Sequence, residues 1–134
     1  MGTKEVVKQY FAALNEGRAA DMEKLKAPHS AYWMSGEGAW PFGGDMSGEK
    51  FAQLWALVQH RFVEGPVLVV KAIIAEGQRA AVHIQVRALR QDGRVYDNQV
   101  VMLLTVVDGL ITEQREFLDT IHVNELFCGP LDEK

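Results

Sequence analysis

In the first half of the chain, apolar residues recur at the spacing of amphipathic helices. One such stripe predicts a helix over residues 4–15. A second long helix is predicted over 48–62, because Ser47 can cap its first turn and apolar residues line one side. Between them, a short helix over about 19–26 precedes an aromatic and glycine-rich segment, 29–46, typical of short strands and turns.

From residue 66 onward the apolar pattern changes to that of β-strands. Four strands are predicted, over residues 66–76, 79–90, 95–107 and 110–119. Asp-Gly pairs at 92–93 and 108–109 are strong hairpin signals. Helices followed by a meander of long antiparallel strands predict an α+β fold. Because such strands exceed the usual length of about five or six residues, we expect a curved sheet.

The hairpin turns also predict which residues face each other. If Asp92-Gly93 forms a two-residue loop, residue 91 pairs with residue 94. The same rule at Asp108-Gly109 sets the pairing of the last two strands. The predicted pairs on one side of the sheet are His83–Met102, Gln85–Val100, Arg87–Asn98 and Asn98–Asp119.

This register divides the sheet into two unequal faces. One face is almost wholly apolar, with Val82, Ile84, Val86, Ala88, Val101, Leu103 and Val107. The other mixes apolar residues with His83, Gln85 and Arg87. The helices are too few to cover both faces, so we expect them to enclose a pocket against the mixed face and the apolar face to be buried in a homodimer. The alternative is a sheet whose apolar face is partly exposed to solvent.

Composition and charge narrow the classes of function. The 134 residues fit one domain, 1–134, and 48% hydrophobic and 24% charged residues are an ordinary globular balance. A net charge of −4 argues against a nucleic-acid partner, which normally needs a basic face. The apolar runs are too short to cross a membrane, and the N-terminus lacks the apolar core of a signal peptide, so we expect a cytoplasmic protein.

Metal and cofactor sites are not indicated. The single cysteine, Cys128, excludes an internal disulfide and a cysteine-built metal site. No histidine has metal-ligand spacing to another ligand on the same predicted element. No glycine-rich run lies between a strand and a helix, as phosphate loops require. We therefore predict no metal and no cofactor.

Several stretches resemble one known family. "KQYFAALNEG", "AYWMSGEGAWPFGG", "DMSGEKF" and above all "DGLITEQREFLDT" are similar to the SnoaL-like branch of the nuclear transport factor 2-like superfamily. That superfamily also includes ketosteroid isomerase and limonene-epoxide hydrolase. The resemblance covers nearly the whole chain. It implies a cone-shaped sheet wrapped around about three N-terminal helices, with a pocket between them, in proteins that are often dimeric through the outer face of the sheet.

The resemblance implies different chemistry for different relatives. The polyketide cyclase pattern places an acid where Glu116 stands and a histidine where Met102 stands. The epoxide hydrolase pattern requires an arginine and an aspartate where His83 and Gln85 stand, which argues against that reaction here. Ketosteroid isomerase uses a tyrosine as an oxyanion donor, and Tyr10 is the best match.

Glu116 is the acid that this comparison favours, although its direction is open. Strict alternation along the last strand gives it the opposite parity from Asp119, which points it away from the pocket. A bulge near Arg115–Glu116 would turn it inward, where burial would raise its pKa and suit it to proton transfer. The alternative is an outward acid in a salt bridge.

The other candidates each have a structural alternative. His83, with Gln85 beside it, is a candidate base and ligand contact, or a hydrogen-bonded core histidine. Tyr10 shares a helix stripe with Phe11 and could simply pack in the core. The row Arg87–Asn98–Asp119 could orient a substrate or rigidify the sheet. Further expected ligand contacts are Trp33, Trp40, Phe42, Trp55 and Met102, with Tyr32 near the pocket mouth.

Two functions remain open on the sequence alone. The first is a cofactor-free isomerase or cyclase that performs acid–base chemistry on a small apolar or aromatic, carbonyl-bearing molecule, with Glu116, His83 and Tyr10 in the catalytic roles. The second is a non-catalytic ligand-binding or structural dimer. Met102 and Gln85 favour the second, because relatives carry ionisable groups at those positions.

Overall fold

The structure, a computed structural model, describes residues 1–132. It contains four α-helices, one π-helix and six strands in that range. The helices are α1 (Thr3–Asn15), α2 (Ala19–Lys24), α3 (Gly48–Arg61), α4 (Thr120–Val123) and the π-helix η1 (Asn124–Cys128). The strands are β1 (Lys26–Met34), β2 (Gly44–Asp45), β3 (Val67–Glu76), β4 (Arg79–Leu89), β5 (Val95–Val107) and β6 (Leu110–Phe117).

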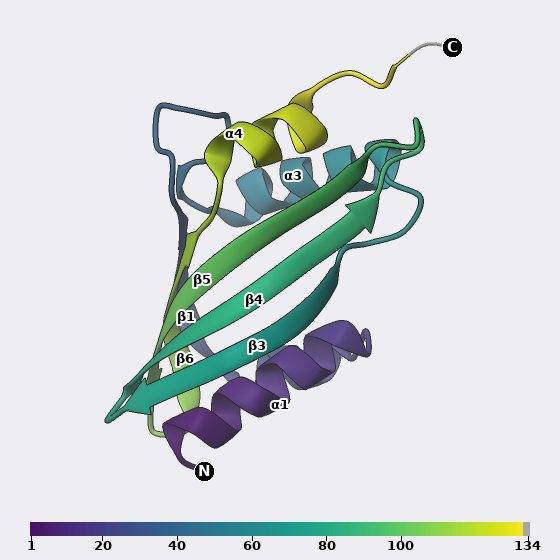
Figure 1. The fold of residues 1–134 in the computed structure, drawn as a ribbon. Helices are drawn as coiled ribbons and strands as arrows, with labels where there is room; N and C mark the ends of the chain where they lie inside the picture. Colours follow the sequence, from purple (N-terminus) through teal and green to yellow (C-terminus); the bar gives the residue numbers. More distant parts are fainter. Residues whose placement is uncertain (133–134) are drawn as a thin grey trace.

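All six strands join in one sheet, in the order β2-β1-β6-β5-β4-β3. The pair β1–β6 is parallel, and the other neighbours are antiparallel. Figure 1 shows long strands crossing the molecule, with α1 beside β3 and with α3 and α4 over the opposite end. The α+β class with a curved, mixed sheet is therefore confirmed.

The ends of the two long helices follow the sequence signals. Gly17, just after α1, has a φ of 69°, the left-handed conformation that glycine adopts without strain. Ser47 caps α3, because its hydroxyl accepts a hydrogen bond from the Lys50 amide at 3.1 Å. The helix over residues 120–128 was not predicted; the Asp119 carboxylate starts it by accepting hydrogen bonds from two backbone amides.

The predicted register between β4 and β5 is wrong by one residue. Gln91, Asp92 and Gly93 form a three-residue loop, because the Arg90 amide bonds to the Arg94 carbonyl at 2.8 Å. Gly93 has a φ of 87°, as expected for the last residue of such a loop. The observed pairs are Val82–Met102, His83–Val101, Gln85–Gln99, Val86–Asn98 and Arg87–Asp97.

This shift exchanges the two faces of β4 relative to β5. The helices cover an inner face that is mainly apolar, and not the mixed face that was predicted. The inner face includes Val82, Ile84, Val86 and Ala88 of β4 and Tyr96, Asn98, Val100, Met102 and Leu104 of β5. Against it, α1 buries Val6, Val7, Tyr10 and Phe11. Helix α3 itself buries fewer side chains than α1, since Val58 is its one buried residue among those described.

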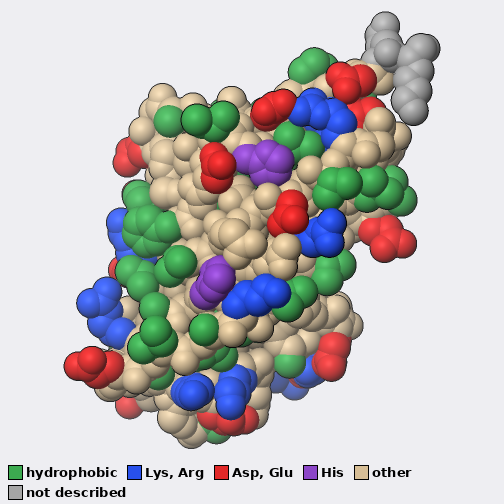
Figure 2. All heavy atoms as spheres, in the orientation of Figure 1, with side chains coloured by type: hydrophobic (Ala, Val, Ile, Leu, Met, Phe, Trp, Pro, Cys, Tyr) green, Lys and Arg blue, Asp and Glu red, His purple; other side chains and the backbone are tan. Residues whose placement is uncertain are grey.

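The outer face of the sheet is open in the single chain. It combines polar residues with exposed aliphatic and aromatic ones: Val67, Val69, His83, Gln85, Arg87, Leu89, Val95, Asp97, Gln99, Val101 and Phe117. Figure 2 shows hydrophobic side chains on both sides of a central band that contains histidine, acidic and basic side chains. Within residues 1–132, no helix is long and apolar enough to cross a membrane.

Candidate functional site

Glu116 faces the inner side of the sheet because β6 contains a bulge. The pairing of β5 with β6 shifts there: Val106 faces Ile111, whereas Thr105 faces Glu113. Thr112 is therefore an extra residue, and it moves the alternation of the following side chains by one position. Glu116 consequently pairs with Met102 on the inner face. A bulge was the condition for this orientation, but it occurs at Thr112 and not at the expected Arg115–Glu116.

Glu116 lies in largely apolar surroundings and has one hydrogen-bonded partner. Its neighbours on the flanking strands are Met102 and Met34, both buried. The Tyr32 hydroxyl donates a hydrogen bond to Glu116 Oε1. Burial raises the pKa of the Glu116 carboxyl, and the hydrogen bond from Tyr32 lowers it in part. Burial, followed by the charge of Glu116, raises the pKa of the Tyr32 hydroxyl well above its usual value, so the phenol keeps its proton.

This pair can carry a proton. A carboxyl whose pKa is raised is a stronger base when ionised, and it works closer to neutral pH than an exposed acid does. The phenol beside it remains a donor and can stabilise a developing negative charge. Tyr32 comes from β1 and Glu116 from β6, and the parallel pairing of those strands holds the two side chains together.

Asn98 anchors the segment that directly follows β6. Its Nδ2 donates to the Tyr96 hydroxyl at 2.9 Å and to the Asp119 carbonyl at 3.1 Å, and its Oδ1 accepts from the Asp119 amide at 3.2 Å. The predicted contact between Asn98 and Asp119 therefore exists, but through the backbone of Asp119. Burial raises the pKa of the Tyr96 hydroxyl, so Tyr96 also stays protonated.

Other predicted residues also reach the inner side. Tyr10 is buried, and its ring packs edge-on against Phe11 with centroids 5.5 Å apart. Trp40 and Phe42 are buried against each other, and Trp40 Nε1 donates to the Ser35 carbonyl at 2.9 Å. Both rings belong to the hydrophobic cluster that closes the α3 end of the inner face.

Three predicted residues of β4 lie on the outer face, because of the register shift. His83 is exposed and its Nε2 contacts Gln99 Oε1 at 2.7 Å. Gln85 Nε2 donates to Asp97 Oδ1 at 3.0 Å, and the same carboxylate lies 3.5 Å from Arg87 Nε. None of the three lies beneath the helices. The row Arg87–Asn98–Asp119 is thus broken at Arg87, whose partner is Asp97.

Two predicted tryptophans do not line the inner face around Glu116. Trp33 lies on the outer face, where the Arg115 guanidinium stacks 4.0 Å from its ring and Phe117 packs at 5.3 Å. Because side chains alternate along β1, Trp33 points to the outer face whereas its neighbour Tyr32, expected near the pocket mouth, points to the inner face. Trp55 is 47% exposed on α3.

Neither the hydrogen bond from Tyr32 to Glu116 nor the burial of the Gln114 amide was predicted from the sequence. Gln114 is 2% exposed and its Nε2 contacts Met102 Sδ at 3.5 Å. The signal for Tyr32 lay in the short segment 29–46, where parity within β1 could not be assigned without knowing its neighbour. The signal for Gln114 would have been the bulge at Thr112, which has no glycine to mark it.

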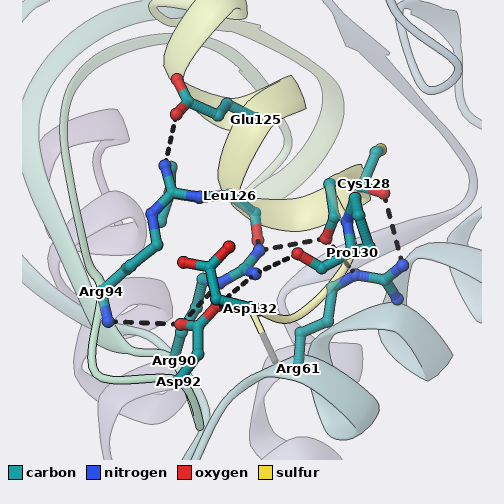
Figure 3. Close-up of polar contacts among 10 residues, drawn as sticks. Arg61, Arg90, Asp92, Arg94, Glu125, Leu126, Cys128, Pro130 and Asp132 are labelled. Carbon is teal, nitrogen blue, oxygen red and sulfur yellow. Dashed lines mark hydrogen bonds and ion pairs between the residues drawn. The ribbon is translucent and has the colours of Figure 1, made fainter. Parts of the chain in front are cut away.

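A buried arginine holds the C-terminal segment over the α3 end, and this feature was also missed. Figure 3 shows Arg90 between the β4–β5 loop and the chain after η1. The Arg90 and Asp92 side chains are 0% and 2% exposed, and Arg90 Nη2 lies 2.7 Å from Asp92 Oδ2. Arg90 also donates to the carbonyls of Leu126, Gly129 and Pro130 at 2.6, 3.1 and 2.8 Å.

Two further arginines near Arg90 also hold the C-terminal segment. Arg61 donates to the carbonyls of Gly129 and Cys128, and Arg94 pairs with Glu125. The hydrogen bonds from Arg90 are the main cause that lowers the pKa of Asp92. Leu126 and Phe127 are thereby held in the hydrophobic cluster with Trp40 and Phe42. A sequence signal existed: Arg90 continues the inner-face alternation of β4, where a charge requires a buried partner.

No metal site is evident among the residues described. Residues 1–132 contain no group of three His, Cys, Asp or Glu side chains arranged to hold a metal ion. Two surface grooves have volumes of about 350 and 520 Å³, the first between α1 and β3 and the second over the outer face near Val67 and Leu89. Neither groove is lined by Glu116 or Tyr32.

Comparison with known proteins gives a family match. The sequence model of one protein family, described as the SnoaL-like domain, matches residues 7–114. No curated protein matches the sequence.

Solved structures share the fold at low identity. An NTF2-like protein of unknown function from Burkholderia pseudomallei is 18% identical with a TM-score of 0.77, and the match covers 93% of this chain and 96% of that one. IdmH from Streptomyces antibioticus, assigned provisionally as a polyketide cyclase, is 20% identical with a TM-score of 0.71 over 90% and 94% of the two chains. A provisional SnoaL-like polyketide cyclase from Jannaschia is 19% identical with a TM-score of 0.73 over 96% and 92%.

Proposed function

Since the chain belongs to the SnoaL-like domain family, we propose that it binds a small apolar, carbonyl-bearing molecule at the inner face and moves a proton on it without a cofactor. The observation that carries this proposal is the hydrogen bond from Tyr32 to Glu116 between two buried methionines. The structural likeness to two provisional polyketide cyclases supports an isomerase or cyclase reaction.

In this reaction, the Glu116 carboxylate removes a proton from the carbon next to the carbonyl group. The electron pair of that C–H bond forms a C–C double bond, and the carbonyl oxygen becomes an enolate oxygen. The Tyr32 hydroxyl, released from Glu116 as the substrate enters, donates a hydrogen bond to that oxygen. If the substrate has a C–C double bond next to the deprotonated carbon, the protonated Glu116 returns the proton to the far end of the conjugated enolate, the C=O bond re-forms and the double bond has moved, which completes an isomerisation. If the substrate has a second carbonyl group, the enolate carbon attacks its carbon, the first C=O bond re-forms, and the protonated Glu116 gives its proton to the new alkoxide oxygen, which closes a ring.

The surroundings favour an uncharged ligand. Met34 and Met102 flank the acid, and thioether side chains pack well on aromatic rings. Arg90, a buried cation of the same face, is already neutralised by Asp92. A ligand carboxylate or phosphate would therefore lose its water without gaining a cationic partner there.

Proton abstraction can be tested without knowing the natural substrate. A panel of small ketones and lactones would be incubated with the protein in deuterium oxide, and loss of the proton signal next to the carbonyl would be followed by NMR. We expect exchange with the wild type and a loss of about 10²-fold or more in Glu116→Gln. Glu113→Gln removes an exposed acid of the same strand and is the matched control. Equal exchange in both variants would refute the role of Glu116.

A second candidate is a ligand-binding protein without turnover. It is favoured by Met102, which faces Glu116 at the position where the cyclase pattern has a histidine, so that the acid has no ionisable partner across the strand pair. Under this proposal, Glu116 and Tyr32 form a hydrogen-bonding site for a ligand that is recovered unchanged. A ligand that binds the wild type, shifts the Tyr32 and Glu116 resonances and shows no deuterium exchange would select this candidate.

A homodimer through the outer face is also proposed. Val101, Leu89, Val95 and Val67 are between 42% and 58% exposed there, and sheet faces with such residues are commonly covered by a second subunit. The face composition differs from the one predicted, because the register shift places His83, Gln85 and Arg87 on it. Sedimentation velocity tests the proposal: Val101→Lys should yield monomer, whereas Ile121→Lys, which changes an 80% exposed residue of α4, should not alter the assembly.

A further inference from the structure

The strand β3 forms one edge of the sheet, and most of that edge is unpaired. Along an edge strand, every second residue turns its N–H and C=O groups away from the sheet. Leu68 is one of these residues, Val70 is the next, and Ile73 and Ala75 follow beyond the bulge at Lys71. Among residues 1–132, no hydrogen bond reaches the outward groups of Val70, Ile73 or Ala75. These groups are available to another strand.

One position of this edge already has a substitute for a neighbouring strand. Asn15, the last residue of α1, donates from Nδ2 to the Leu68 carbonyl at 2.6 Å and accepts from the Leu68 amide through Oδ1 at 3.2 Å. A carboxamide carries the same donor and acceptor as a peptide group. The Asn15 side chain therefore shows that the edge binds a peptide-like group in the geometry of a β-ladder, and it marks where a docked strand would have to end.

An apolar groove runs beside the unpaired part of the edge. It lies between α1 and β3, has a volume of about 350 Å³ and is lined by Phe11 and Ala12 on one side and Val70 and Ile73 on the other. Figure 1 shows α1 alongside β3 at this place. A seventh strand hydrogen-bonded to β3 would direct alternate side chains toward α1, because side chains alternate across a sheet. Those side chains would fill the groove.

The rim of the groove is basic. Lys8 lines it, and Lys4 lies one helical turn earlier on the same side of α1. Lys71 stands at the bulge of β3. None of these three lysines forms an ion pair with any residue from 1 to 132. A strand that carries a carboxylate toward α1 would thus meet an unpaired positive charge.

From these features we propose that the β3 edge and the α1–β3 groove together form a docking site for an extended acidic–apolar peptide segment of a partner protein. The peptide adds to the sheet as a seventh strand beside Val70–Ala75, places apolar side chains on Phe11 and Ile73, and presents an acidic side chain to Lys8. Main-chain hydrogen bonds supply part of the affinity, and the groove and its charge supply selectivity. The proposal does not depend on the chemistry of Glu116.

A second copy of this chain fits the site less well. Pairing of two β3 edges about a two-fold axis would bring the two Lys71 residues, and the lysine-bearing sides of both α1 helices, toward one another. Lysines on an edge strand oppose such pairing. The charge of the rim therefore favours a partner of opposite sign.

A designed peptide provides the test. The probe has seven residues, acetyl and amide ends and the sequence Thr-Val-Thr-Glu-Thr-Val-Thr, so that Val, Glu and Val share one face. Amide chemical shifts and solvent exchange of the ¹⁵N-labelled protein would be followed by NMR as peptide is added. We expect saturable binding tighter than about 1 mM, with protection of the Val70, Ile73 and Ala75 amides. No saturation, or protection elsewhere on the protein, would overturn the proposal.

Two controls separate strand addition from simple charge attraction. A peptide N-methylated at alternate residues keeps its side chains but loses the donors that would face β3, and it should not bind. Lys8→Glu should weaken binding of the original probe by about tenfold, which corresponds to about 1.4 kcal/mol. Lys24→Glu makes the same change of net charge at the end of α2 and should leave binding unchanged.

The remaining outcomes decide against the proposal. Binding that survives N-methylation would mean that the site recognises side chains alone. Protection of Val70 and Ile73 that grows with protein concentration in the absence of peptide would identify a second copy as the occupant. If Lys8→Glu and Lys24→Glu weaken peptide binding equally, the peptide is held by long-range charge attraction and not by the groove.

Discussion

Tyr32 of β1 donates a hydrogen bond to the carboxylate of Glu116 on β6, although 84 positions separate the two residues in the sequence. The parallel pairing of β1 with β6 brings them together, and the bulge at Thr112 turns Glu116 to the side on which Tyr32 lies. The phenol and the carboxyl then share low-dielectric surroundings, in which each alters the proton affinity of the other.

Replacing Tyr32 with phenylalanine should raise the pKa of Glu116 further. The hydrogen bond from the phenol favours the ionised carboxylate, so its loss leaves the effect of burial unopposed. The measurement is the titration of the Glu116 side-chain carboxyl carbon by NMR in both proteins. Tyr10→Phe, which removes the hydroxyl of a buried tyrosine of α1, is the control for a general change in packing. A lower pKa in Tyr32→Phe would contradict the prediction.

Glu116→Gln should become more stable relative to the wild type as the pH rises. The folded-state pKa of Glu116 is raised, so the wild type binds more protons folded than unfolded above the ordinary carboxyl value of 4.5. Its contribution to stability is therefore fully present below that pH and is lost as the pH rises through the folded-state pKa. Each unit of pKa elevation corresponds to about 1.4 kcal/mol.

Urea unfolding of both proteins at about pH 4 and pH 7 checks this prediction. Glu113→Gln, which removes an exposed carboxylate of β6, is measured beside it. A free-energy difference between Glu116→Gln and the wild type that stays constant with pH would show that the carboxyl titrates alike in the folded and unfolded states.

Arg90→Met should destabilise the fold by about 3–5 kcal/mol, because it removes the cationic partner of a buried carboxylate and the hydrogen-bond donor of three carbonyls. Arg87→Met, which breaks an exposed pair with Asp97 on the outer face, should cost at most about 1 kcal/mol. Urea unfolding gives both values. The backbone amides of the C-terminal segment should also exchange with solvent faster in Arg90→Met. An equal loss of unfolding free energy in the two variants would contradict the role of Arg90 in holding that segment.

Gly93→Ala should cost about 1–2 kcal/mol. Gly93 has a φ of 87° with open space around it, so the cost comes from backbone conformation and not from a clash. Gly48→Ala provides the comparison: that site at the start of α3 also has open space, and its φ is not positive. Thermal unfolding should show a lower Tm for Gly93→Ala alone. A lower Tm in both would point to a general requirement for glycine.

The element order could be predicted because hydrophobic periodicity and caps are local signals. The helix over 4–15 and the strands over 79–90 and 95–107 were placed within a residue or so of α1, β4 and β5. What failed was the link between strands, since Asp92-Gly93 fits both a two-residue loop and the observed three-residue loop. One additional loop residue changes no propensity along either strand, yet it exchanges the faces of β4 and β5 relative to each other.

For the candidate site, family resemblance and local pattern pointed in different directions. Glu116 was identified from the motif around it, and its inward direction depended on a bulge that sequence alone could not place. His83 was misplaced because its face was inferred from the hairpin register. Tyr32 and Arg90 needed partners that are remote in sequence, Glu116 and the carbonyls after η1. Such long-range pairs leave no local periodicity to detect.

The single extra residue at Thr112 also has an evolutionary meaning. Deletion of the Thr112 codon would remove the bulge and leave Glu113 opposite Thr105 and Glu116 opposite Met102, so the inward acid would be kept. Loss of the bulge with the chain length unchanged would instead pair Arg115 with Met102 and turn Glu116 outward. Relatives of equal length can therefore differ in whether this acid faces inward, and a comparison of substitutions column by column would not register the difference.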